Sequence, residues 1–128
     1  MYSEEVMKIF QNPTNAGMIK GATTTGQVTE KNFGDIMKIY LKIENEVIVD
    51  AKFKTYGCVA SIVATNIICD KVKGKTIENA LNITSQEILD EMGDIPENKK
   101  YCAVLAQEVV KEAIDNYYKK LEKEKNDK

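Results

Sequence analysis

The sequence predicts an α+β fold, in which a small three-stranded antiparallel sheet has helices packed on one face. Strand-like alternation of apolar and polar residues is confined to the chain before residue 57, and helix-like patterns fill the chain after it. Such segregated blocks are typical of α+β domains rather than of alternating α/β ones. The 128 residues suit one domain, expected over residues 1–120, followed by a charged and disordered tail at 121–128.

The first elements are a short helix and an edge strand. Residues 3–10 are predicted to be helical, with Ser3 as the N-cap and with Val6, Met7 and Phe10 along one side. The polar, Thr-rich run over residues 21–30 suits an exposed strand at the edge of the sheet.

A hairpin is predicted next. Residues 35–43 alternate apolar and polar side chains, and residues 47–56 form a second strand after a turn at 44–46. On the second strand, one face is expected to carry Val47, Val49, Ala51 and Phe53.

Four helices are predicted in the second half, over residues 58–72, 76–81, between Thr84 and Gly93, and over about 100–120. The first is apolar around most of its surface and should be largely buried, with Gly74 ending it. The run Thr84-Ser85-Gln86-Glu87 is a capping box.

The composition excludes several classes of function. The net charge is −2, with Lys and Glu mixed along the chain, so neither a nucleic-acid footprint nor a membrane-binding basic patch is expected. No apolar run approaches the roughly 18–20 residues that span a bilayer. The polar, acidic start of the chain is unlike a leader peptide, so the protein is expected in the cytoplasm.

Histidine is absent from the sequence, which excludes every His-dependent catalytic triad and every His-ligated metal site. A metal would have to use Cys, Asp or Glu. The three cysteines, Cys58, Cys69 and Cys102, are an odd number and widely spaced, which argues against a disulfide framework.

Three residues at the ends of predicted elements could converge. Cys58 lies where a strand gives way to a helix, and Cys102 lies near the start of the last helix, where the helix dipole favours thiolate. Lys99 and Lys100 would add positive charge beside Cys102, and Asp35 heads a strand. The alternative is that the cysteines are small core residues and that Asp35 belongs to a turn.

Cys69 is interpreted as a core residue. It lies on the same helix as Cys58, about 16 Å further along, which is too far for both to bind one metal centre.

The sequence resembles the U-type iron–sulfur cluster assembly scaffolds, the family of IscU and of the N-terminal domain of NifU, over nearly the whole chain. The markers are short runs in a fixed order: Asn12-Pro13-Thr14-Asn15, Gly34-Asp35-Ile36-Met37-Lys38, Ala51-Lys52-Phe53-Lys54-Thr55-Tyr56-Gly57-Cys58, Val72-Lys73-Gly74-Lys75, and Cys102 with the helix after it.

The resemblance implies a non-enzymatic scaffold that takes sulfur from a cysteine desulfurase, gathers iron, holds a transient [2Fe-2S] cluster and passes it to apo-proteins. It implies that Asp35, Cys58 and Cys102 are the metal ligands, with Cys102 as the main sulfur acceptor. Lys99 matches a family lysine.

The chain departs from the family pattern at three places. Phe33 stands where the family has its first cysteine, and Tyr101 stands where it has a histidine. The chaperone-recognition motif reads Ile95-Pro96-Glu97-Asn98-Lys99, which puts recognition by an Hsp70-type chaperone in doubt. The sequence retains three of the expected ligands, whereas a [2Fe-2S] cluster requires four.

Three hypotheses therefore stay open. The chain is a working scaffold whose fourth ligand comes from a second subunit of a homodimer, an acceptor thiol or a nearby carboxylate. Alternatively, it is a degenerate paralogue that docks a desulfurase or carries sulfur without building a cluster. The third hypothesis is a single Zn²⁺ or Fe²⁺ ion on the three ligands and water.

Overall fold

The computed structural model describes residues 2–126 and confirms the α+β prediction. Three strands form one antiparallel sheet in the order β1-β2-β3: β1 is Thr24–Thr29, β2 is Ile36–Glu44 and β3 is Val47–Tyr56. The helices are α1 (Glu4–Gln11), α2 (Val59–Val72), α3 (Ile77–Leu81), α4 (Ser85–Met92), the 3₁₀ turn η1 (Glu97–Lys99) and α5 (Tyr101–Asn126).

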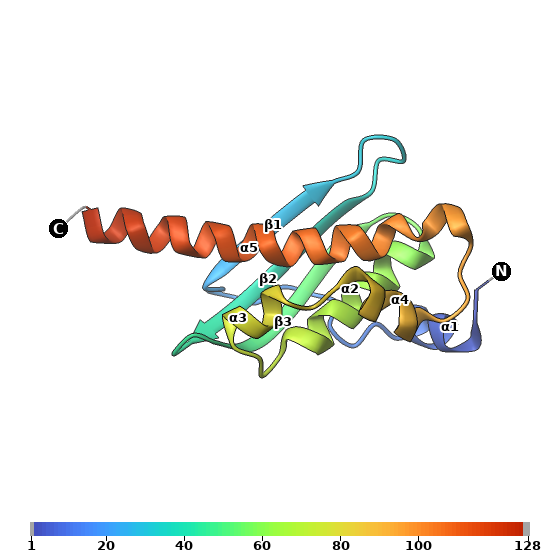
Figure 1. Ribbon diagram of the computed structural model, residues 1–128, viewed down its shortest axis with the longest axis horizontal. Helices are drawn as coiled ribbons and strands as arrows, with labels where there is room; N and C mark the ends of the chain where they lie inside the picture. Colours follow the sequence, from blue (N-terminus) through green and yellow to red (C-terminus); the bar gives the residue numbers. More distant parts are fainter. Residues whose placement is uncertain (1, 127–128) are drawn as a thin grey trace.

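Helices α2 and α5 cover one face of the sheet. The long helix α5 crosses β1 and β2, and α2 packs on β3, as Figure 1 shows. The sheet approaches α5 closely at Gly26 of β1, where an added Cβ would lie 2.5 Å from the backbone nitrogen of Ala113. The core lies between these helices and the sheet, and α2 is buried along most of its length, as predicted.

The hairpin between β2 and β3 is confirmed, but its second strand differs in phase from the prediction. Asn45 and Glu46 both have positive φ in the turn, and a register shift lies between Lys42 and Ile43. This bulge moves the start of β3 by one residue, so Ile48 is fully buried while Val49 is 42% exposed. The prediction that Val47, Val49, Ala51 and Phe53 share one face is therefore wrong at Val49, because Ala51 and Phe53 are buried.

Two predicted helix caps are present. The Ser3 hydroxyl accepts a hydrogen bond from Val6 N at the start of α1, and Thr84 and Glu87 form both bonds of a capping box at α4. On α1, Val6 is fully buried, whereas Phe10 is 36% exposed.

Helix α5 continues to Asn126 and so includes residues 121–126 of the segment predicted to be a disordered tail; residues 127–128 lie outside the described part of the chain. Lys and Glu, which dominate this stretch, are good helix formers, so a charged sequence can extend an existing helix. Within residues 2–126, no helix is both long and apolar enough to cross a membrane.

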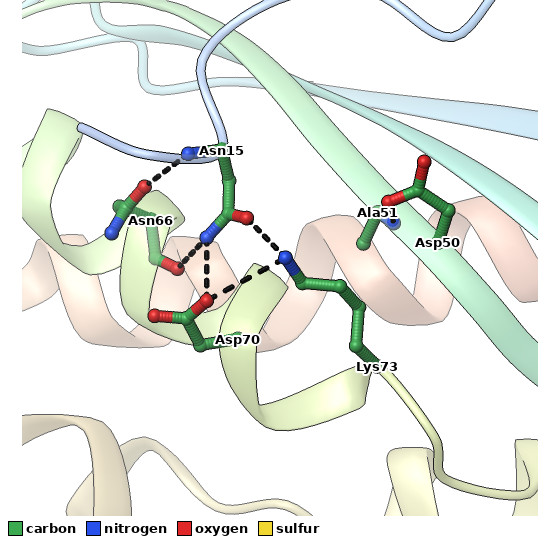
Figure 2. Close-up of polar contacts among 6 residues, drawn as sticks. All are labelled: Asn15, Asp50, Ala51, Asn66, Asp70 and Lys73. Carbon is green, nitrogen blue, oxygen red and sulfur yellow. Dashed lines mark hydrogen bonds and ion pairs between the residues drawn. The ribbon is translucent and has the colours of Figure 1, made fainter.

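A buried asparagine joins the segment before β1 to α2. The Asn15 backbone N–H donates to Asn66 Oδ1 at 2.9 Å, and its side-chain amide donates to Asn66 O at 3.1 Å and to Asp70 Oδ1 at 2.8 Å (Figure 2). Lys73 donates to the Asn15 side-chain oxygen and pairs with Asp70 at 3.6 Å. A bridge between Ala16 and β3 continues the connection to the sheet. The Asn15 marker of the sequence thus fixes α2 relative to β3, and with it the start of α2.

Candidate metal centre

Three elements bring Asp35, Cys58 and Cys102 together at one end of the molecule. Asp35 follows the loop between β1 and β2, Cys58 is the N-cap of α2, and Cys102 is in the first turn of α5. Figure 1 shows that this loop and the first turns of α2 and α5 lie at the same end. One ligand atom from each residue lies within 4.8 Å of the others. The predicted convergence of these three side chains is therefore found.

The loop before β2 holds Asp35 in place. The Glu30 carboxylate accepts the backbone N–H groups of Asn32 and Phe33, and Glu30 N donates to Asp35 O at 2.8 Å. Gly34 turns the chain with a φ of +78°. The Asp35 residue is 4% exposed, so its carboxylate is a buried acid that needs polar partners.

Cys58 is half-buried, and its surroundings favour thiolate. Burial alone would raise the pKa of the thiol, but the Ser61 N–H and hydroxyl, the Cys102 thiol and the Lys99 ammonium together lower it below its ordinary value. Helix N-termini lower thiol pKa values in this way because their N–H groups point at the sulfur. Lys99, which was predicted to add positive charge beside Cys102, acts on Cys58, and Lys100 pairs with Glu97 at 2.9 Å.

Cys102 is fully buried, and its thiol behaves differently. Burial, followed by the neighbouring Cys58 sulfur, raises the pKa of the Cys102 thiol to about 12. The two sulfurs lie 3.9 Å apart. The pair therefore combines one thiol whose pKa lies below its ordinary value with one whose pKa lies above it.

The spacing of the sulfurs fits a shared metal ion. In a tetrahedral site with metal–sulfur bonds of about 2.3 Å, two thiolate ligands are about 3.8 Å apart. The 3.9 Å between Cys58 Sγ and Cys102 Sγ is close to that value. Two thiolates and one carboxylate suit Zn²⁺ or Fe²⁺, and they leave one tetrahedral position for another ligand.

An aromatic pair lies beside the three residues. The Tyr101 hydroxyl donates to Asp35 Oδ2 at 2.9 Å, and its ring stacks on Phe33 with centroids 5.1 Å apart and 16° between the planes. Burial and the bond to Asp35 raise the pKa of Tyr101, so the phenol stays protonated. In the sequence, Phe33 and Tyr101 could be described only as positions where a ligand of the resembling family is replaced. The two residues are far apart along the chain, and no sequence pattern predicts that they are in contact.

Cys69 lies elsewhere, as predicted. It is fully buried in the core on the far part of α2, and burial raises the pKa of its thiol. Cys69 therefore belongs to the packing of the core and is not part of the three-residue group.

Comparison with known proteins gives a consistent match over most of the chain. The family model described as the NifU-like N terminal domain matches residues 1–124. The iron-sulfur cluster assembly scaffold protein IscU 1 of Archaeoglobus fulgidus is 41% identical over 120 residues, which cover 94% of this chain and 78% of that protein. The scaffold protein IscU of Aquifex aeolicus is 39% identical over 121 residues, covering 93% and 77%.

Solved structures show the same fold. The N-terminal NifU-like protein from Brucella abortus superposes with a TM-score of 0.72 at 18% identity, covering 92% of this chain and 94% of that one. At this identity the likeness concerns the arrangement of the sheet and helices alone.

Proposed function

This chain belongs to the family of NifU-like N-terminal domains, and from that premise we propose that it is a scaffold for iron–sulfur cluster assembly. Its substrates are iron and sulfane sulfur, which an external reductant converts to sulfide, and its product is a transient [2Fe-2S] cluster for transfer to apo-proteins. The observation that carries the proposal is the convergence of Asp35, Cys58 and Cys102, whose ligand atoms lie within 4.8 Å of one another.

Sulfur would enter as a persulfide from a pyridoxal-phosphate cysteine desulfurase. When docking of the donor exposes Cys102, its thiol gives up a proton and the sulfur attacks the outer sulfur of the donor persulfide. A Cys102 persulfide forms, the sulfur–sulfur bond of the donor breaks, and the donor cysteine leaves and takes up the proton as its thiol. Cys102 is fully buried in the free protein, so docking of the donor has to expose it. Cys58, which is half-buried and 3.9 Å away, is placed to bind iron beside the new persulfide.

The site offers three protein ligands, and a cluster wants four. Phe33 stands where a fourth ligand would come from, and its side chain is stacked on Tyr101. The fourth ligand is therefore external: a thiol of the acceptor protein or of a second copy of this chain. A weakly held cluster suits a scaffold, because it has to leave.

A second candidate is a site for one Zn²⁺ or Fe²⁺ ion. The 3.9 Å between the two sulfurs favours it, because that separation matches two thiolates on the same tetrahedral ion. In this case Asp35 and water complete the coordination. Such an ion could also be the first iron of a cluster.

The partners that follow from the proposal are a cysteine desulfurase and apo iron–sulfur proteins. The protein acts by holding and transferring its substrates rather than by turning them over as an enzyme. The cytoplasm is the expected compartment, because its reducing conditions keep the thiols free for sulfur and iron.

Anaerobic reconstitution tests the proposal. The protein is incubated with Fe²⁺, L-cysteine, a cysteine desulfurase and a thiol reductant that supplies the electrons for sulfide formation. The product is followed by absorption and Mössbauer spectroscopy. The signals of a [2Fe-2S] cluster should form with wild type and with the core control Cys69→Ala, and should be lost with Cys58→Ala and Cys102→Ala.

Other outcomes separate the alternatives. A persulfide on Cys102 without bound iron, detected by mass spectrometry, would contradict the scaffold function and indicate that the protein carries sulfur. One bound metal ion per chain with no cluster would favour the single-ion site. If Cys69→Ala abolished the cluster while Cys58→Ala kept it, the assignment of the site would be wrong.

A further inference from the structure

Asp35 depends on one side chain for its hydrogen bonding. Among residues 2–126, the Tyr101 hydroxyl is the side-chain donor to its carboxylate, at 2.9 Å on Oδ2. The Asp35 residue is 4% exposed, so water has little access to replace this bond. A buried carboxylate that loses such a partner either reorients or is destabilised.

Tyr101 is itself held from a second direction. Its ring lies nearly parallel to Phe33, with centroids 5.1 Å apart and 16° between the planes, and the Lys99 ammonium lies over the Phe33 ring at 5.5 Å. Phe33 is 57% exposed, yet its backbone N–H is bound by the Glu30 carboxylate at 2.7 Å. The Phe33 side chain therefore has contacts with the Tyr101 ring and the Lys99 ammonium and lies outside the buried core.

We propose that Tyr101 is the positioning residue of the metal centre: its hydroxyl holds the Asp35 carboxylate within reach of the two sulfurs, and Phe33 with Lys99 holds the Tyr101 ring. The inference rests on the proposed function, because it concerns metal binding by the same three ligands. While a neutral phenol donates to Asp35 it cannot be a ligand, so Tyr101 acts only through Asp35. Outer partners of this kind orient ligands and typically change metal affinity by 10–100-fold.

The contact also accounts for both aromatic residues at once. Asp35 immediately precedes β2, and Tyr101 is the first residue of α5. The hydrogen bond and the ring stack therefore connect the loop before β2 to the first turn of α5. These are two of the three elements that supply ligands. The stack thus maintains the approach of Asp35 to Cys102 in a chain that has no further ligand at position 33.

The test uses four proteins in a double-mutant cycle: wild type, Tyr101→Phe, Asp35→Ala and the double variant. Tyr101→Phe removes the hydroxyl and keeps the ring on Phe33. Affinity for Zn²⁺ is measured by competition with a chromophoric chelator, and Co²⁺ spectra report the coordination. Tyr117→Phe, the same change further along α5, is the matched control.

Tyr101→Phe should weaken Zn²⁺ binding by 10–100-fold, and Tyr117→Phe should leave it unchanged. In the Asp35→Ala background, Tyr101→Phe should weaken Zn²⁺ binding by less than about twofold, because the carboxylate that Tyr101 positions is absent. Phe33→Ala should weaken binding less than Tyr101→Phe, since the hydroxyl remains. Wild-type affinity in Tyr101→Phe, or a loss that persists undiminished without Asp35, would overturn the proposal.

The same four proteins, unfolded by urea without metal, separate this inference from the proposed function. The two substitutions should be non-additive in the unfolding equilibrium constant by about tenfold, because one charge-assisted hydrogen bond joins the two groups. Additive effects in the apo-proteins would refute the Tyr101–Asp35 coupling even if a cluster forms. Failure of wild type to bind metal or sulfur, with the coupling intact, would refute the proposed function alone.

Discussion

Substituting Gly57 tests the packing around the metal centre most directly. Gly57 lies between β3 and α2, and a Cβ there would be 2.3 Å from Ser61 Oγ and 2.9 Å from Asp35 Cγ. Real Cβ atoms essentially never come closer than 3.0 Å to another heavy atom. The Gly57 backbone does not have a positive φ, so alanine can adopt it and the cost of Gly57→Ala is steric.

The magnitude follows from how little its neighbours can move. Ser61 is fully buried, and its hydroxyl donates to Cys58 O at 2.8 Å; Asp35 is 4% exposed and bound by Tyr101. Overpacking of this kind costs about 1–3 kcal/mol of unfolding free energy. Because one of the displaced groups is a proposed ligand, Zn²⁺ affinity should fall by about tenfold or more as well.

Urea denaturation of the apo-protein and chelator competition for Zn²⁺ measure the two effects. The double variant Gly57→Ala with Ser61→Ala removes the shortest clash and leaves the one with Asp35. It should regain part of the stability while Zn²⁺ binding stays weak. If Gly57→Ala kept both the unfolding free energy and the Zn²⁺ affinity of wild type, the close approach of Asp35 to the start of α2 would be wrong.

Three further predictions concern stability and thiol chemistry. Asn15→Ala removes the two hydrogen bonds that the side-chain amide donates and the one that its oxygen accepts from Lys73. It should lower the unfolding free energy in urea by about 3 kcal/mol, whereas exposed Asn32→Ala should change it by less than about 0.5 kcal/mol. Thr84→Ala breaks the capping box of α4 and should lower the same quantity by about 1 kcal/mol; an unchanged midpoint would contradict the cap. Burial raises the pKa values of the Cys69 and Cys102 thiols, so above about pH 9 the folded state binds more protons than the unfolded state. The unfolding free energy in urea should therefore fall between about pH 9 and pH 12. The fall should be less steep in Cys69→Ala.

Local chemistry explains which parts of the fold could be predicted from the sequence. Ser3 and Thr84 cap their helices through bonds to residues three positions away, so the pattern is complete within a short run. The bulge between Lys42 and Ile43 depends instead on how two strands pair. Alternation alone therefore placed Val49 on the wrong face of β3.

The same distinction applies to the site. The sequence could predict that three side chains converge, namely Asp35, Cys58 and Cys102. Each lies at the end of an element, and the family resemblance implies that they belong to one metal site. The lack of space for a side chain at Gly57 could not be predicted from the sequence, because it depends on how closely Asp35 approaches the start of α2. A glycine before a helix has several ordinary roles, and only the packed structure selects one.

Phe33 and Tyr101 show how two apparent losses can be one structural change. Taken separately in the sequence, each removes a group that the resembling family uses at its metal site. In the folded chain they form a single stack, and that stack ends in a hydrogen bond to the retained Asp35. A chain that had simply lost its site would not need Asp35 to stay buried and bound by a neighbouring hydroxyl, because an unused carboxylate is less costly in water. The burial of Asp35, together with two sulfurs at the spacing of shared metal ligands, supports the proposal that these three residues bind a metal.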